Sequence, residues 1–120
     1  MQVRFETIDG VLRVEIRGRE TAEQTRASIE AALAERERRG VLRILISVRE
    51  SRTIFKVEQF GLSGFLDRIA PIGGLRVAVV ADEPDLHAAH QYIEVLAAQR
   101  GLRYRAFRSE AAATEWLRAR

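Results

Sequence analysis

Arginine is the residue type in this chain whose number and placement first suggest chemistry. Of the twenty basic residues, nineteen are arginines and one is Lys56. Several arginines follow segments with the pattern of strands, so we expect them at the carboxyl-end rim of a parallel sheet, where helix N-termini also gather. Guanidinium groups beside helix N-termini bind anions such as phosphate. The predicted anion rim consists of Arg19, Arg49, Arg52 and Arg108.

The same arginines also stand close to carboxylates in the sequence. If they pair with these acids, the rim is a solvated charged surface and not a binding site. The sequence leaves both interpretations open. The acids concerned are Glu20, Glu50, Asp82 and Glu83.

Two histidines, His87 and His90, are three residues apart and share one face of a predicted helix. Asp82 and Glu94 lie nearby in the sequence, so a metal ion is geometrically possible. However, no third ligand stands at a diagnostic spacing, and the His-Glu-x-x-His pattern is absent. The chain has no cysteine, which excludes thiolate ligands and disulfides. We therefore predict no metal site and no cofactor, with His87 exposed and His90 beside the packed face.

Hydrolysis requires a nucleophile, a base and a group that orients the base. Ser51, His87 and Asp82 could meet on the rim, but no Gly-x-Ser-x-Gly element supports this arrangement. We predict no catalytic residue and a protein that is not an enzyme.

The overall composition excludes several other classes of function. The chain has 120 residues, 47% of them hydrophobic and 31% charged, which predicts one globular domain over residues 1–120. The net charge is only +3 and the basic residues are dispersed among seventeen acids, so we predict no nucleic-acid partner. No run approaches the ~20 apolar residues of a membrane span, and the first residues lack the apolar core of a signal peptide. We expect a cytoplasmic protein without integral membrane association.

The elements that position these residues begin with a predicted β-hairpin. Residues 3–7 and 12–16 alternate apolar and polar side chains, which is typical of strands. Asp9-Gly10 between them favours a type I′ turn, which needs positive φ at both central residues. Residues 41–48 hold six apolar residues in eight. A strand that is apolar on both faces has to lie in the middle of a sheet, covered by helices on at least one side.

Helix signals separate the other strands. Thr21 and Gln24 form a capping box at the start of a helix that ends near Arg39. The remaining predicted elements are a helix from about residue 55 to Ala70, a strand over 75–81, a helix beginning at residues 82–85, an edge strand over 102–107 and a helix capped by Ser109. With right-handed crossovers, the order β-β-α-β-α-β-α-β-α predicts an α/β fold. Its five-stranded mixed sheet has the first strand antiparallel and the rest parallel, and four helices cover it.

The second predicted helix carries two apolar faces. The expected core face is a stripe at helical spacing that contains Phe55, Leu62, Leu66 and Ile69, with Phe65 at its edge. The opposite face combines apolar side chains with glycines, which let another helix approach closely. Either a partner docks there, or the helix bends at its glycines and buries both sides within the fold. The residues of this second face are Val57, Phe60, Gly61 and Gly64.

Several segments together resemble one known group of proteins. They are the hairpin at Asp9-Gly10, the strand V-L-R-I-L-I-S-V, the strand L-R-V-A-V-V-A-D before an acidic helix start, and the closing F-R-S-E-A-A-A-T-E-W-L. On these segments the chain resembles anti-sigma-factor antagonists of the STAS fold, and more closely the STAS/SEC14-like (SpoIIAA-like) family of small bacterial proteins. The resemblance implies a STAS-type fold and a regulatory role through protein contact.

One element of that resemblance is missing. Anti-sigma-factor antagonists carry Asp-Ser-Ser/Thr-Gly after the central strand, and a hydroxyl of this element is phosphorylated as the switch. Here the corresponding residues are Arg49-Glu50-Ser51-Arg52-Thr53. Ser63-Gly64 matches only part of the element and lies inside a predicted helix. The sequence leaves open whether Ser51 or Thr53 is phosphorylated.

We predict a non-enzymatic STAS-like binding and regulatory module that acts through contact with a protein partner or as a homodimer. Its predicted surface is the loop after the third strand with the second helix: Arg49, Ser51, Arg52, Thr53, Phe55, Val57, Phe60, Gly61 and Gly64. The alternative, by analogy with SEC14-type proteins, is a carrier of a small apolar or lipid-like ligand. Its cavity would lie between the second helix and the sheet, lined by Phe55, Phe60, Phe65 and Ile69, with an anionic head group at Arg49 and Arg52.

Overall fold

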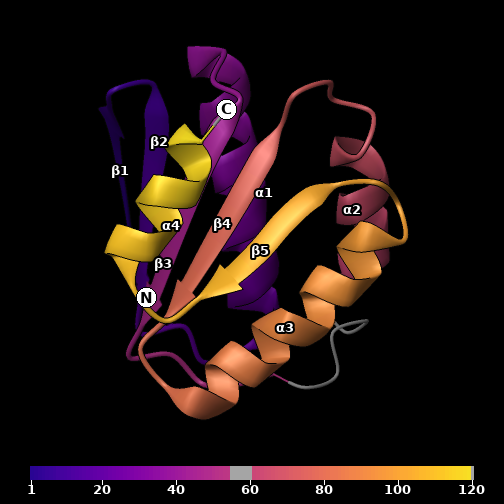
Figure 1. Cartoon of the computed structure of the whole chain (residues 1–120). Coiled ribbons are helices and arrows are strands. Elements are labelled where there is room, and N and C mark those ends of the chain that lie inside the picture. Colours follow the sequence, from indigo (N-terminus) through magenta and orange to yellow (C-terminus); the bar gives the residue numbers. More distant parts are fainter. Residues whose placement is uncertain (55–60, 120) are drawn as a thin grey trace.

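A sheet whose strands lie in chain order is the frame of the fold. The computed structural model of the chain describes residues 1–54 and 61–119. In this part the strands are β1 (Gln2–Ile8), β2 (Val11–Arg17), β3 (Arg43–Arg49), β4 (Arg76–Ala81) and β5 (Arg103–Phe107), and the helices are α1 (Ala22–Arg39), α2 (Leu62–Ile69), α3 (Pro84–Ala98) and α4 (Glu110–Arg118). The sheet order is β1-β2-β3-β4-β5. β1 pairs antiparallel with β2 and all later pairs are parallel, which confirms the predicted directions of the strands (Figure 1).

The hairpin of β1 and β2 forms for the reason predicted from its turn. Asp9 and Gly10 have φ of 50° and 80°, the positive values that a type I′ turn requires. The turn sets a register in which Ile8 faces Val11. Because successive side chains of a strand point to opposite faces, β2 presents apolar residues to one side and charged residues to the other.

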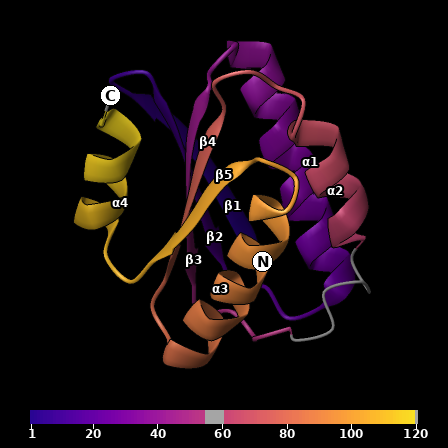
Figure 2. The same ribbon diagram turned by 45° about the vertical axis from the view of Figure 1, so that its right-hand side comes forward.

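β3 lies in the middle of the sheet and is buried on both faces. Ile44 and Val48, each 2% exposed, pack in the larger core, whereas Leu45, 3% exposed, packs in a smaller one. Figure 2 shows α4 on one side of the sheet and α1, α2 and α3 on the other. Each fully buried Leu or Val contributes roughly 1.5–3 kcal/mol. The smaller core, under α4, consists of Val11, Leu45, Ala78, Val80, Ala113 and Leu117.

The predicted starts of α1 and α4 are confirmed. The hydroxyl of Thr21 accepts a hydrogen bond from the N–H of Gln24 (3.1 Å), and the hydroxyl of Ser109 accepts one from the N–H of Ala112 (3.3 Å). These caps satisfy backbone donors that the first turn of a helix leaves unpaired. β5 is an edge strand, as its arginines predict.

The predicted start of the second helix, near residue 55, lies outside the described residues, but the predicted helix is interrupted at Gly61. α2 begins at Leu62, and Ile54 lies outside any helix. Gly61, the residue before the helix, has a φ of 71°. A right-handed helix cannot continue through a residue in the left-handed conformation, so no single helix runs from residue 55 to Ala70. Three residues of the predicted surface lie outside the described residues: Phe55, Val57 and Phe60.

The predicted core face of α2 is confirmed where the structure describes it. Leu62, Phe65 and Leu66 are buried, and Ile69 is half-buried. Gly64 on the other side is exposed, and no neighbouring atom of residues 1–54 or 61–119 lies within 4 Å of the position that a Cβ would take. The second face of α2 is therefore open at Gly64.

The two glycines of this region should respond oppositely to alanine. Gly61→Ala places a Cβ in the left-handed region and should lower the free energy of unfolding by about 1 kcal/mol. Gly64→Ala puts a better helix former at an open helical position and should raise the free energy of unfolding by up to about 1 kcal/mol. Urea denaturation of both variants measures the difference. Effects of the same sign would contradict the backbone conformations described above.

Candidate binding site

The loop after β3 is held by hydrogen bonds to the main chain. The hydroxyl of Ser51 donates to the carbonyl of Arg49 (2.8 Å) and accepts from the N–H of Arg19 (3.2 Å). The N–H of Arg52 donates to the carbonyl of Arg19 (2.8 Å). These bonds tie residues 49–52 to the segment that leaves β2. Ser51 is half-buried and Arg52 is exposed.

The loop turns at Glu50, whose φ is 50°. A non-glycine residue adopts this conformation where its surroundings hold it there. The N–H of Glu50 donates to the carboxylate of Asp82 after β4 (3.1 Å). The Glu50 side chain is 71% exposed, with Oε1 3.6 Å from Nη1 of Arg17. The loop thus presents the side chains of Glu50 and Arg52 to solvent from a fixed backbone.

The four arginines of the predicted anion rim lie in different surroundings. Arg49 points toward α4, where its Nη2 is 3.2 Å from Oε2 of Glu110. Arg19 lies on the other face of the sheet and is only 7% exposed. Arg108 donates to main-chain carbonyls at the end of β4 (3.3 and 3.4 Å), and Arg52 is exposed. The structure does not bring these guanidinium groups together.

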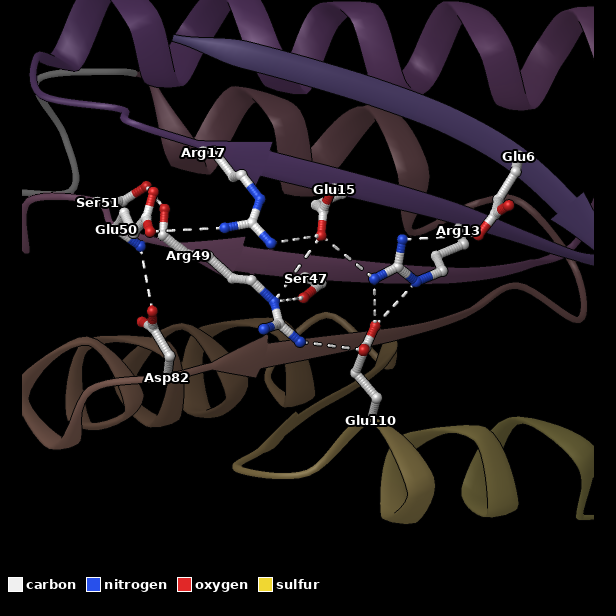
Figure 3. Close-up of polar contacts among 10 residues, drawn as sticks. All are labelled: Glu6, Arg13, Glu15, Arg17, Ser47, Arg49, Glu50, Ser51, Asp82 and Glu110. Atoms are coloured by element: carbon white, nitrogen blue, oxygen red, sulfur yellow. Dashed lines mark hydrogen bonds and ion pairs between the residues drawn. The ribbon is translucent and has the colours of Figure 1, made fainter.

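A charged cluster lies on the face of the sheet toward α4 (Figure 3). Its members are Arg13, Glu15, Arg17, Arg49 and Glu110. Oε1 of Glu110, the first residue of α4, lies 2.8 Å from Nη2 of Arg13. Oε1 of Glu15 lies 3.3 Å from Nη2 of Arg17 and 3.5 Å from Nη2 of Arg13. Since Arg49 also reaches Glu110, the cluster joins the start of α4 to β2 and β3.

The charged cluster was not predicted from the sequence, although the sequence pattern of β2 indicates part of it. Period-two alternation places Arg13, Glu15 and Arg17 on one face of β2. Arg49 and Glu110 are 61 residues apart in the sequence, however, and only the packed fold shows that they meet. The acids considered for the rim did not include Glu110.

Two opposing effects act on the pKa of Glu15. Burial raises this pKa because the carboxylate loses water, whereas the hydrogen bonds and positive charges of Arg17 and Arg13 lower it. The arginines prevail, so the pKa of Glu15 lies below its ordinary value. A carboxyl group with a lowered folded-state pKa stabilises the fold above its unfolded-state pKa. That contribution is lost as the pH falls through the folded-state pKa.

Glu15→Gln should lower the free energy of unfolding by roughly 1 kcal/mol at neutral pH, because it weakens the acceptor shared by three arginines, Arg13, Arg17 and Arg49. The difference from the wild type should shrink as the pH falls below about 4.3, the ordinary pKa of glutamate. Urea denaturation at a series of pH values measures this difference. Glu115→Gln, at an exposed position of α4, is the control and should show no such trend. A Glu15→Gln effect that is independent of pH would contradict the assigned pKa direction.

A cavity between the sheet and helices α1, α2 and α3 is the second candidate site. Its volume is about 120 Å³, and most of the side chains that line it are apolar. Phe65 and Ile69 line it, as predicted for a ligand cavity beside the second helix. Arg49 and Arg52, predicted for a ligand head group, are not among the described residues that line it. Arg49 does not line the cavity because its side chain points to the opposite face of the sheet.

Polar side chains reach this cavity at Arg19, His90 and Tyr104. Burial, followed by the positive charges of Arg19 and His87, lowers the pKa of His90 to about 3, so its imidazole is neutral at pH 7. Burial raises the pKa of Tyr104, which keeps its phenol protonated. Burial also lowers the pKa of Arg19, but a guanidinium stays charged in proteins.

The histidine and serine arrangements suggested by the sequence do not assemble. His90 is 5% exposed and His87 is half-buried. Among residues 1–54 and 61–119, no group of three His, Cys, Asp or Glu side chains could hold a metal ion. The hydroxyl of Ser51 and the carboxylate of Asp82 both bond to main-chain groups of the loop after β3. The structure therefore offers no nucleophile–base pair from these side chains.

The sheet and its covering helices define the class of this protein. A five-stranded mixed sheet with one antiparallel edge strand and helices on both faces, as the described residues form, is the arrangement of STAS-type domains. The sequence profile of the SpoIIAA-like family matches residues 11–118. The chain therefore belongs to the SpoIIAA-like family, whose STAS-type domains are generally regulatory and non-enzymatic.

No protein with a curated description matches the sequence. In the described part of the chain, none of the helices is both long enough and apolar enough to span a membrane.

Proposed function

We propose that this protein, a single STAS-like domain over residues 1–120, acts as a non-enzymatic regulatory module through contact with another protein. The contact surface is the loop after β3 with the exposed side of α2, within residues 49–64. The observation that supports this surface is the loop itself. Its backbone is held by the bonds of Ser51 and Arg52 to the segment after β2, while the side chains of Glu50 and Arg52 face solvent. A preformed loop binds a partner with little loss of conformational entropy.

Self-association is the form of this proposal that the purified protein tests directly. We expect a dimer whose dissociation constant rises at least about tenfold in Gly64→Asp, which is about 1.4 kcal/mol. The substitution places a charge in the contact, while aspartate in the first turn of α2 suits the helix dipole. Sedimentation velocity over a concentration series measures the dissociation constant, and circular dichroism checks the fold.

Arg103→Glu is the control for this experiment, because Arg103 is exposed on the edge strand β5 and far from the loop in the sheet order. It should leave the dissociation constant unchanged. A wild-type protein that stays monomeric, or a control that weakens the dimer as much as Gly64→Asp, would rule out self-association through this surface.

The cavity supports a second function, that of a carrier for a small apolar or lipid-like ligand. Its place between α2 and the sheet is the one predicted for such a carrier. Its volume of about 120 Å³ is within the size range that holds small organic molecules, since an apolar cavity of about 150 Å³ in another protein binds benzene. The carrier function and the protein contact use different parts of the structure, so each has its own test.

Toluene tests the carrier function, and we expect it to raise the midpoint of thermal unfolding of the wild type. Ala89, 7% exposed, lines the cavity, whereas Ala88 beside it is exposed. Ala89→Leu fills part of the cavity and should abolish the toluene effect, at a cost in stability of about 1–3 kcal/mol. Ala88→Leu is the matched control and should retain the effect. A wild type that does not respond to toluene would refute the carrier function.

A further inference from the structure

Arg19 is a buried cation at the cavity. It is 7% exposed and lines the cavity together with His90 and Tyr104. Its Nη2 donates one hydrogen bond, to the carbonyl of Arg52 (2.8 Å). Its Nε is buried and has no hydrogen-bond partner in the described part of the chain. Among the residues that the structure describes, no carboxylate acts on Arg19 as a counter-ion.

A buried charge without a counter-ion is unfavourable, because its removal from water is offset only by an opposite charge or by several hydrogen bonds. The contrast within this chain is direct. On the other face of the sheet, Arg13 and Arg49 keep 24% and 38% of their side chains exposed, and both still reach Glu110. Arg19 is more deeply buried, and the only acceptor that its guanidinium reaches among the described residues is the carbonyl of Arg52. An anion from outside the chain would supply the counter-ion that the described residues do not give Arg19.

Arg19 is close enough to act electrostatically on His90 and Tyr104, which also line the cavity, and the rest of the lining is mostly apolar. His90 has an Nδ1 without a hydrogen-bond partner among the described residues, and Tyr104 has a buried hydroxyl. Both side chains are neutral and can donate or accept a hydrogen bond. Thr25 and Ser28 of α1 also line the cavity, but their hydroxyls already donate to main-chain carbonyls. The hydroxyl of Thr25 donates to the carbonyl of Thr21 (3.1 Å), and that of Ser28 donates to the carbonyl of Thr25 (2.8 Å). Arg19 is the charged group of the described lining.

Building on the proposed carrier function, we propose that the cavity binds a small monocarboxylate, with the carboxylate against Arg19 and the apolar body in the rest of the cavity. His90 and Tyr104 are the neutral hydrogen-bond partners of the carboxylate. One buried cation matches one negative charge, whereas a phosphate dianion would leave a charge uncompensated. Arginine holds carboxylates through parallel N–H donors, and Nε is free to serve as one of them.

The cavity volume sets the size of this ligand. At about 120 Å³ the cavity is slightly smaller than one of about 150 Å³ that holds benzene, which points to a ligand of about six non-hydrogen atoms. Butyrate has this size, and benzoate is a larger probe of the same site. Each has a neutral amide of nearly the same shape, butyramide and benzamide, which separates the role of charge from that of size.

The test compares each acid with its amide by isothermal titration calorimetry. We expect the wild type to bind butyrate or benzoate at least about tenfold more tightly than the matching amide, since the ion pair forms in a low-dielectric site. Arg19→Met keeps an unbranched apolar side chain and removes the guanidinium charge, so the preference for the acid should disappear while toluene still binds. Arg103→Met, at an exposed position of β5, is the control and should retain the preference.

Two further measurements separate a binding role of Arg19 from a structural one. Without ligand, Arg19→Met should raise the midpoint of thermal unfolding, because it removes a buried charge that lacks a counter-ion; a structural arginine would lower it. In the wild type, the Nε–H resonance of Arg19 should shift when benzoate or butyrate is added. This second measurement does not depend on the folding of any variant.

The outcomes distinguish this inference from the carrier function on which it rests. Toluene binding without any preference for the acids, or a preference that survives in Arg19→Met, would overturn the inference and leave the carrier function standing. Failure of toluene, acids and amides alike would overturn both.

Discussion

The burial of β3 on both faces is the constraint on which the rest of the structure depends. A strand without a solvated face needs cover on two sides, and it receives three helices on one side and α4 on the other. This unequal cover gives the faces of the sheet different chemistry. Under α1, α2 and α3 the face is apolar around one cavity. The face toward α4 is apolar under that helix and carries the charged cluster beside it.

Arginine charge is compensated differently on the two faces. In the charged cluster, three arginines share Glu15 and Glu110 at a partly solvated position. Single pairs of this kind contribute little to stability, but a shared set of acceptors holds α4 against β2 and β3. On the other face, Arg19 is withdrawn from water and has no such acceptor among the described residues. The structural arginines and the candidate ligand-binding arginine are thus separated by the sheet itself.

Local patterns predicted the parts of the fold that local physics decides. The alternation in β2 and the turn at Asp9-Gly10 depend only on neighbouring residues, so their prediction succeeded. The start of α2 could not be predicted, because periodicity does not reveal that Gly61 is left-handed. Arg19 was expected on the rim because it follows a strand. Its side chain instead turns inward toward His90 and Tyr104, residues that only the packed fold brings near it.

The strand order also bears on how the chain folds during synthesis. In the described part of the chain every strand pairs only with its neighbours in sequence order, so paired residues such as Arg43 and Arg76 are no more than one crossover apart. The hairpin is complete at residue 17, and each later strand adds to the free edge of a sheet that already exists. The apolar strand β3 emerges from the ribosome after β1 and β2. Until β4 and β5 follow, its edge is an open template for strands of other chains, which is the interval when the nascent protein most needs shielding from aggregation.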